Sequence, residues 1–397
     1  MRVALIHYWL VKSRGGEKVL DALCELFPDA DIFTHVYDPA AVSETIRRHT
    51  VHTTFIHKLP GAIRHYQTYL PLMPLALEAL DLRAYDLVIS SESGPAKGVL
   101  VSPETLHVCY CHTPMRYIWD LYHDYRASAG PLTRLLMPPL VHYLRLWDVV
   151  SANRVDQFIA NSSAVARRIQ RHYRRPSRII HPPVDVDAFV PVAQPDDFYL
   201  VVGQLVPYKR AELAVEAFNR LGRKLVVIGD GPQLKALRAQ AGPMVSILGP
   251  QPFSVLRDHY ARCRALVFPG EEDFGIVPVE AMASGRPVIA LRKGGALDTV
   301  VEGLSGLFFD RPEPQSLMDA VIRFEAAEHD FDSAAIVAHA RQFDRSRFLA
   351  EMREVLDRGW AGRGGGNAVL PYGAALGRDA GHPPFNDAAL AANNPHR

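Results

Sequence analysis

The chain is poor in cysteine, carries almost no net charge and has no long uninterrupted apolar run. Only four of its 397 residues are cysteines, so we expect no disulfide framework, which fits a reducing cytosol. A net charge of +1 gives no electrostatic basis for nucleic-acid binding. The N-terminus lacks the apolar core of a signal peptide, and no segment has the composition of a transmembrane helix. These absences favour a cytoplasmic protein without nucleic-acid partners.

The residues that are present are those of a soluble globular chain, 48% hydrophobic and 22% charged. Short apolar runs alternate with helix-length segments, and each run ends in polar residues, glycine or proline. Runs that are apolar on both faces are typical of parallel strands covered by helices, so we predict an α/β fold of doubly wound, Rossmann-like sheets. The predicted strands are Val3–Leu10, Asp31–Tyr37, Asp86–Glu92, Leu106–His112, Gln157–Ser162, Arg178–Pro183, Phe198–Gly203, Lys224–Asp230, Val245–Pro250, Ala265–Gly270, Pro287–Arg292 and Gly306–Asp310.

Twelve strands are more than one open sheet comfortably holds, so we divide the chain into two domains. The joint is expected at 182–197, which is rich in proline and aspartate. The N-terminal domain then spans 1–185 and the C-terminal domain 186–340. A helical stretch at 341–360 is expected to pack back on the N-terminal domain. From 361 to 397 the chain is rich in glycine, alanine, proline and asparagine and offers little to bury, so we predict a disordered tail.

Two carboxylates, Glu272 and Glu280, flank the most informative local pattern. Gly275 allows a sharp entry into a helix that begins near Ile276, and Pro278 falls in the first turn, where backbone N–H groups lack partners. Glu280 then lies about one turn into the helix, beside the amide-rich end that attracts anions. Carboxylates bind sugar hydroxyls and helix-end amides bind phosphate, so the pattern suits a nucleotide-sugar.

Other candidate residues also follow predicted strands, where open parallel sheets bind ligands. Gly15 and Gly16 would let the backbone approach a phosphate, and Lys209 and Arg210 could bind diphosphate oxygens. His112, at the end of a strand, could donate a hydrogen bond to a sugar hydroxyl or to a developing charge. Taken singly, these patterns also fit a plain turn, solvated basic residues and a structural histidine.

Two patterns superficially resemble metal sites, and we expect a metal at neither. Cys109 and Cys111 share one face of a strand beside His112, but two sulfurs and one histidine make a poor structural zinc set. Asp185 and Asp187 match the carboxylate pattern of metal-dependent transferases. Because they follow two prolines at the expected joint, a capping or linker role is the better interpretation.

One segment, 132–150, mixes leucine, methionine, tyrosine and tryptophan with arginine and histidine. This mixture fits a segment at a membrane interface. It fits equally well a buried helix pair with ordinary surface arginines, and the sequence leaves both interpretations open.

Taken together, the motifs resemble those of the family 4 retaining glycosyltransferases, which have the GT-B fold of two Rossmann-like domains facing across a cleft. The first half is similar to the bacterial polysaccharide and lipopolysaccharide mannosyltransferases within that family. The segments that carry the resemblance are Gly203–Arg210, Gly229–Pro232, Ile247–Gly249, Phe268–Glu272, Phe274–Val288, Gly294–Gly295 and Gly303–Gly306 in the second half, and Gly15–Lys18, Cys111–Asp120, Ala160–Ser162 and His181–Asp185 in the first.

The resemblance implies roles for individual side chains. Glu280 would hold the ribose of the donor and Glu272 would contact the transferred sugar. Lys209 would neutralise the diphosphate. His112 would hydrogen-bond the sugar near the reacting carbon, and we group it with Glu272 and Lys209 as the expected catalytic residues.

Backbone amides complete the implied donor site. Gly15 and Gly16 would present amides to the diphosphate from the first domain, and Gly275 and Ile276 would do so from the helix start in the second. On this basis the second domain binds the nucleotide-sugar and the first faces the acceptor.

The chain departs from the family pattern at two positions. Gln204 stands where the family often has arginine, so phosphate binding would depend more on Lys209 and Arg210, with Gln204 still part of the donor site. Asp298 stands where the family often has glutamate, and its shorter side chain puts a contact to the donor in doubt.

The implied reaction is metal-free hexosyl transfer with retention, by front-face displacement and without a cofactor. The expected donor is GDP-mannose, and the expected acceptor is a lipid-linked or polysaccharide glycan at the inner face of the membrane, with peripheral membrane association. Three alternatives stay open: another donor such as a UDP-hexose, a sugar-nucleotide epimerase of the same architecture, and a silent subunit that binds a partner transferase.

Overall fold

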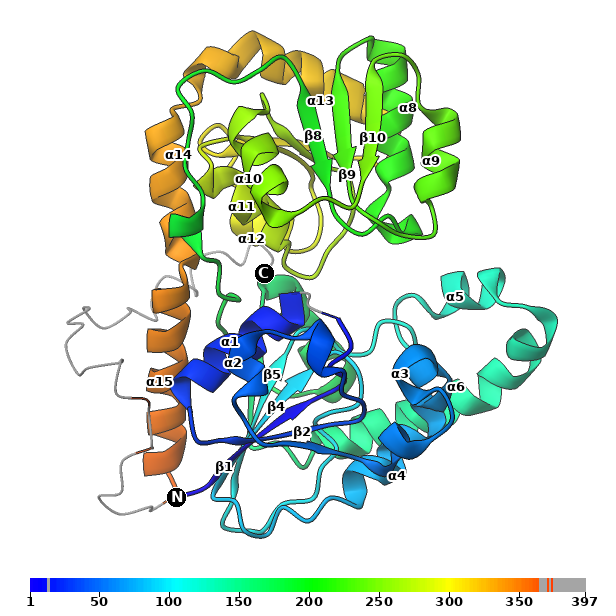
Figure 1. Ribbon diagram of the computed structural model, residues 1–397, viewed down its shortest axis with the longest axis vertical. Coiled ribbons are helices and arrows are strands. Elements are labelled where there is room, and N and C mark those ends of the chain that lie inside the picture. Colours follow the sequence, from blue (N-terminus) through cyan, green and yellow to red (C-terminus); the bar gives the residue numbers. More distant parts are fainter. Residues whose placement is uncertain (13–14, 364–369, 371–372, 374–397) are drawn as a thin grey trace, which may run out of the picture.

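The computed structural model describes residues 1–12, 15–363, 370 and 373, which form two α/β domains stacked one above the other (Figure 1). The first domain is built on a parallel sheet of seven strands in the order β3-β2-β1-β4-β5-β6-β7. Its strands are β1 Val3–His7, β2 Asp31–Thr34, β3 Val51–Thr53, β4 Leu87–Glu92, β5 Leu106–Cys111, β6 Gln157–Ala160 and β7 Ser177–Ile179.

The second domain repeats this topology with six parallel strands in the order β10-β9-β8-β11-β12-β13. Its strands are β8 Tyr199–Val202, β9 Leu225–Ile228, β10 Val245–Gly249, β11 Leu266–Phe268, β12 Val288–Leu291 and β13 Gly306–Phe309. In both sheets the chain starts in the middle, runs to one edge, and returns to the middle to run to the other. The fold prediction of two doubly wound Rossmann-like domains is confirmed.

Each of the twelve predicted strands is present, and one strand was missed. That strand, β3, lies at the edge of the first sheet beside β2, and its three residues are half-buried or exposed. An edge strand of this length contains no buried apolar run, so periodicity gave no signal for it.

The α-helices lie between the strands and cover both faces of each sheet (Figure 1). They are α1 Gly15–Leu26, α2 Glu44–Arg47, α3 Ala62–His65, α4 Met73–Glu78, α5 Tyr122–Ser128, α6 Pro131–Ala152, α7 Ser163–Tyr173, α8 Ala211–Leu221, α9 Leu234–Gln240, α10 Phe253–Arg262, α11 Ile276–Ala283, α12 Ala296–Thr299, α13 Pro314–Ala327, α14 Ser333–Ala340 and α15 Arg345–Ala361.

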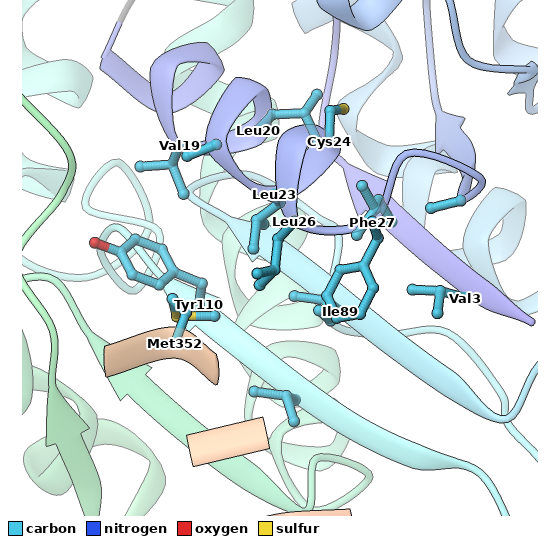
Figure 2. Packing of buried hydrophobic residues seen from close by; sticks show 14 of the residues in the cluster. Val3, Val19, Leu20, Leu23, Cys24, Leu26, Phe27, Ile89, Tyr110 and Met352 are labelled. Carbon is cyan, nitrogen blue, oxygen red and sulfur yellow. The ribbon is translucent and has the colours of Figure 1, made fainter. Parts of the chain in front are cut away.

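The last helix, α15, crosses back to the first domain and lies beside α1 on one face of its sheet (Figures 1 and 2). Its apolar positions recur every three or four residues, as an amphipathic helix requires. Met352 of this helix and Leu23 of α1 belong to one core cluster with Tyr110 of β5. Helices α4 and α6 pack against the opposite face of the same sheet. The first domain is therefore completed by residues from the far end of the chain.

Two chain segments connect the domains and lie side by side. The amide of Val184, in the first crossing, donates to the carbonyl of Phe343 over 3.1 Å, and the amide of Arg345 donates back to Val184 over 3.0 Å. Beyond α15, the guanidinium of Arg363 donates to the carbonyl of Thr105 over 2.6 Å, so ordered contacts continue past residue 360. Most of the tail predicted at 361–397 lies outside the described residues.

Candidate functional site

The carboxyl ends of the two sheets meet at the place where each strand order reverses. In the first sheet this point lies between β1 and β4, and in the second it lies between β8 and β11. Open α/β sheets bind ligands at such switch points, because the loops there diverge and leave a crevice. Gly15 follows β1, and Gly270 follows β11, so the predicted residues converge on this region from both domains.

Glu280 lies where α11 meets the first domain. Its side chain is only 7% exposed, and it accepts a 2.9 Å hydrogen bond from the hydroxyl of Tyr260. Its other oxygen lies 2.8 Å from Nζ of Lys18 in α1. Tyr260 fixes the carboxylate from below, and Lys18 contacts it from across the domain boundary. The residue predicted to bind ribose is thus a carboxylate that is held by Tyr260 and paired with Lys18 across the domain boundary.

Helix α11 begins at Ile276, where the sequence placed it. Gly275 immediately before it has φ of +87°, a left-handed conformation that favours glycine. The first turn of α11 points at the first turn of α1, since a Cβ atom on Gly15 would lie 3.0 Å from Cδ1 of Ile276. Two helix N-termini therefore face one another, and both offer unpaired amides suited to an anion.

Lys209 and Glu272 form an ion pair of 2.9 Å, and each side chain is about a fifth exposed. Two glycines make this approach possible. A Cβ atom on Gly270 would lie 2.7 Å from Cα of Lys209, and Gly203 lies directly beneath the lysine amine. A third glycine, Gly295, donates its amide to the carbonyl of Glu272 over 2.9 Å and so supports the acidic loop from behind.

The other predicted donor residues lie around this pair. Arg210 caps α8 in a left-handed conformation with φ of +55°, uncommon for a residue with a Cβ atom. Gln204 is exposed and lies two residues after the end of β8. The positions of both residues fit the proposed donor site, and their roles as ligands stay predictions.

His112 follows β5 and is half-buried. Its Nε2 lies 2.8 Å from the hydroxyl of Ser91 on β4. Burial, and secondarily the charge of His7, lowers the pKa of His112 to about 3. The ring is therefore neutral at physiological pH, and it acts as a hydrogen-bonding group rather than as a cation.

Several residues that join the domains were not predicted as functional. Asp273, beside Glu272, contacts Arg116 at 3.5 Å and pairs with Arg168 of α7. The carboxylate of Asp298 accepts a 2.5 Å hydrogen bond from the amide of Ser163, which places this residue against the first domain. Arg116 lies within the segment Cys111–Asp120 that carries the family resemblance. Nothing in the local sequence indicates which loop of the other domain it contacts.

A cleft of about 1160 Å³ opens beside this cluster rather than within it. Both domains line it, and its wall includes Tyr125, Tyr208, Arg210, Glu212 and Glu216. A separate cavity of about 10 Å³ is lined by Gln204, Lys209 and Glu272, where the ion pair joins the last two residues.

Two sequence patterns superficially resembled metal sites. Among the described residues, no three histidine, cysteine or acidic side chains lie close enough to hold an ion. Asp187 pairs with Arg341 at 3.1 Å, consistent with a role at the domain junction. Cys109 and Cys111 are free and fully buried in the sheet.

An exposed apolar stripe runs along α6, which projects from the edge of the first domain with α5 (Figure 1). Its most exposed residues are Leu132 at 70% and Leu135 at 73%, and Leu136, Tyr143, Leu146 and Val150 continue the stripe at helical spacing. The segment from Tyr125 to Trp147 contains no acidic residue. Among the described helices none is both long and apolar enough to cross a bilayer.

The fold and site define a two-domain transferase of the GT-B class. Residues 13–188 match the family described as Glycosyltransferase Family 4, and residues 187–342 match that described as Glycosyl transferases group 1. The chain belongs to glycosyltransferase family 4.

Among characterised proteins, the chain is 24% identical to the alpha-1,3/1,6-mannosyltransferase alg2 of Schizosaccharomyces pombe, over 88% of this chain and 78% of that protein. It is 30% identical to the D-inositol 3-phosphate glycosyltransferase of Geodermatophilus obscurus over 48% of this chain. That match spans 50% of the relative, so the chain matches about half the length of this protein.

Solved structures support the fold. Anabaena HepE in complex with UDP and glucose has a TM-score of 0.67 at 18% identity, covering 90% of this chain and 99% of HepE. Sucrose-phosphate synthase from Thermosynechococcus elongatus has a TM-score of 0.69 at 18% identity, covering 91% of this chain and 100% of that one. At this identity the likeness concerns the fold alone.

Proposed function

We propose that the protein is a retaining, metal-independent mannosyltransferase that uses GDP-mannose and acts on a lipid-linked glycan. The observation that carries the proposal is that Lys209, Glu272 and Glu280 lie at the carboxyl edge of the second sheet, opposite the amide-rich start of α1. Positive charge and amides for a diphosphate thus lie beside carboxylates for hydroxyls. The mannosyltransferase alg2 supports mannose over glucose, and the UDP complexes of HepE keep a UDP-hexose as the second candidate.

In this proposal the acceptor hydroxyl attacks the anomeric carbon from the face that the diphosphate leaves. The bond from carbon to diphosphate oxygen breaks through an oxocarbenium-like state, and the departing phosphate takes the acceptor proton. Lys209 and the first turn of α11 stabilise the negative charge that develops on the leaving group. Glu272, released from Lys209, holds hydroxyls of the transferred sugar.

The acceptor would occupy the large cleft between α5 and α8. Its wall combines two tyrosine rings, Tyr125 and Tyr208, with carboxylates and an arginine. Flat rings and carboxylates are suited to sugar faces and hydroxyls. Because α5 leads directly into α6, a glycan in this cleft would lie next to the apolar stripe, where a lipid carrier could remain in the bilayer.

The proposed donor and its metal independence are tested together by incubating the protein with GDP-mannose, UDP-glucose and UDP-N-acetylglucosamine in excess EDTA. We expect nucleotide release from GDP-mannose at an unchanged rate with and without the chelator, since Lys209 and helix amides replace a metal ion. Nucleotide release measured by chromatography, together with the anomeric configuration of any product, gives the readout.

Three outcomes would count against this proposal. Activity lost in EDTA and restored by Mn²⁺ would revive a metal role for Asp185 and Asp187. A sugar changed at one carbon without nucleotide release would indicate an epimerase instead. Binding without turnover of any donor would favour a silent subunit.

Membrane association is tested by sedimentation with vesicles that contain phosphatidylglycerol. We expect the wild-type protein to bind, and the double variant Leu135→Glu/Leu146→Glu to bind at least about tenfold more weakly, because it places two charges in the apolar stripe. Arg126 and Arg134 flank the stripe, so binding should weaken in neutral vesicles and at high salt.

The matched control is Leu297→Glu/Ile322→Glu, which alters two exposed apolar residues of the second domain. This variant should bind vesicles as the wild type does. Equal binding by both double variants, or no binding by the wild type, would refute the assignment of α6 as the membrane surface.

A further inference from the structure

A line of buried polar groups runs from the start of α1 to His112. Oε1 of Glu17 lies 3.6 Å from Nε2 of His7, and Nδ1 of His7 lies 3.1 Å from the hydroxyl of Ser91. The same hydroxyl lies 2.8 Å from Nε2 of His112. Glu17, His7 and Ser91 are each no more than 3% exposed. Bulk water therefore does not compete for these contacts.

The backbone holds this line in place. His7 and Ser91 are paired residues of the adjacent strands β1 and β4, so the sheet fixes their separation. Gly16 brings α1 close enough for Glu17 to reach inward, since a Cβ atom there would lie 2.2 Å from the hydroxyl of Tyr8 and 3.6 Å from the ring of His7. The paired glycines thus serve packing around His7 as well as any approach to phosphate.

Because the hydroxyl of Ser91 has a single proton, the hydrogen bonds along this line share one donor-to-acceptor direction. Ser91 can donate to one histidine only, and it must then accept from the other. Nε2 of His7 makes no hydrogen bond, but the carboxylate of Glu17 lies 3.6 Å from it and attracts a proton there. When His7 is neutral, we therefore place its proton on Nε2, so that its Nδ1 accepts from Ser91. The hydroxyl oxygen then accepts from Nε2–H of His112, which leaves Nδ1 of His112 without a proton.

Protonation of His7 reverses this order. Its Nδ1–H then donates to Ser91, Ser91 donates to Nε2 of His112, and the ring proton of His112 moves to Nδ1 by exchange with water. No described residue hydrogen-bonds Nδ1 of His112, and this nitrogen is not one of the buried atoms left without a partner, so it is open to ligands.

We propose that Glu17, His7 and Ser91 are positioning residues that set the tautomer of His112, and that one proton taken up by His7 converts the open nitrogen of His112 from acceptor to donor. This inference rests on the proposed function only in its consequence for catalysis. With His7 neutral, His112 would accept a hydrogen bond from a hydroxyl of the bound sugar. With His7 charged, it would offer a donor instead, and that contact would be lost.

Two carboxylates and one further imidazole surround His7. Glu17 and Asp21 of α1 both act on it, and His112 faces it from the end of β5. Burial raises the pKa of Asp21. Burial, and secondarily the charge of His7, lowers the pKa of His112 to about 3, so the ring of His112 stays neutral. A change of tautomer in His112 without a change in its charge is therefore the expected signature.

The direct test is nitrogen NMR of the full chain labelled in its 17 histidines, with His112→Asn and His7→Asn used to assign the two rings. Spectra are recorded over a range of pH that covers both forms of His7. We expect His112 to carry its proton on Nε2 while His7 is neutral and on Nδ1 once His7 is protonated. The conversion should follow the titration of His7. A tautomer that stays constant, or a ring of His112 that itself becomes charged in that range, overturns the proposal.

Ser91→Ala breaks the line, and Ser90→Ala is its matched control. Ser90 is also fully buried on β4, and its hydroxyl lies 3.0 Å from Nε2 of His107, a buried histidine outside the line. We expect Ser91→Ala to uncouple the tautomer of His112 from the titration of His7, and Ser90→Ala to leave the coupling intact. Coupling that persists in Ser91→Ala contradicts the proposal.

Kinetics then separate this inference from the proposed function. If the protein transfers sugar, kcat should fall as His7 takes up its proton, and this limb of the pH profile should disappear in Ser91→Ala but not in Ser90→Ala. If Ser91→Ala still shows this pH-dependent fall in kcat, the positioning role is refuted even where sugar transfer is confirmed. If no donor is turned over, the proposed function fails while the NMR result still decides the proton order.

Discussion

Lys209→Ala is expected to lower turnover of the donor by about a hundredfold or more. Loss of one preorganised group that stabilises developing negative charge typically costs about 3–4 kcal/mol in the transition state. Lys209 lies at the carboxyl end of the second sheet, and its amine pairs with Glu272 over 2.9 Å. Because the leaving diphosphate is most negative in the transition state, kcat should fall more than the KM for the donor rises.

Two variants sharpen this prediction. Lys235→Ala removes an exposed lysine from α9 of the same domain and should leave turnover unchanged. Lys209→Arg keeps the charge in a wider, planar group and should recover only part of the rate. Steady-state kinetics with the preferred donor provide the measurement. Turnover of Lys209→Ala within a few-fold of the wild type would contradict the assignment.

Lys97→Met is expected to lower the free energy of unfolding of the first domain by about 3–5 kcal/mol, since it leaves buried carboxylates unpaired. Nζ of Lys97 lies 3.3 Å from Glu92 and also pairs with Asp148, and all three side chains are fully buried. Asp148 further accepts hydrogen bonds from Trp119 and Tyr173. Although burial disfavours the charged form, the two carboxylates raise the pKa of Lys97 above its ordinary value. Lys97 therefore links Asp148 of α6 to Glu92 of β4 through ion pairs.

Urea unfolding measures this loss well, because the chain has four tryptophans and all of them report on the first domain. Trp9, Trp119 and Trp147 pack in its core, and Trp360 packs on it from α15. The loss of stability should shrink at lower pH, because a buried carboxyl without its cation has a folded-state pKa raised above its unfolded-state value. The cost is complete above the folded-state pKa, declines as pH falls through it, and is gone below the unfolded-state pKa.

The control is Lys58→Met, which makes the same substitution at an exposed lysine of the first domain and should not shift the unfolding midpoint. A second variant, Lys97→Met/Glu92→Gln/Asp148→Asn, removes the unpaired charges and should regain part of the lost stability. If Lys97→Met unfolds at the wild-type midpoint, the cluster does not hold α6 in place.

The sequence predicted the backbone of the site well, because the relevant signals are local. Apolar runs marked the strands, since parallel strands are buried on both faces. Gly275 and Pro278 marked the start of α11, since only certain residues fit a sharp turn and a first helical turn. Positions after strand ends brought Lys209 and His112 into consideration, because ligands bind at the carboxyl edge of such sheets.

The sequence could not predict which distant side chains these site residues contact. Lys18 and Glu280 are 262 positions apart and meet only because α1 and α11 start at facing edges of two sheets. Glu17 faces inward to His7, whereas its neighbour Lys18 faces the other domain. The sequence pattern does not indicate that these two side chains point in different directions. Asp298, whose contact was in doubt, contacts Ser163 of the first domain.

The amino-acid sequence by itself determined the family, the two Rossmann-like sheets and the residue types that gather at their edges. Only the tertiary structure decided that α15 completes the first domain, that Lys18 pairs with Glu280 across the domain boundary, and that a serine joins two histidines. The physical reason is range: propensity and periodicity act over a few residues, whereas side-chain pairing depends on how distant segments pack.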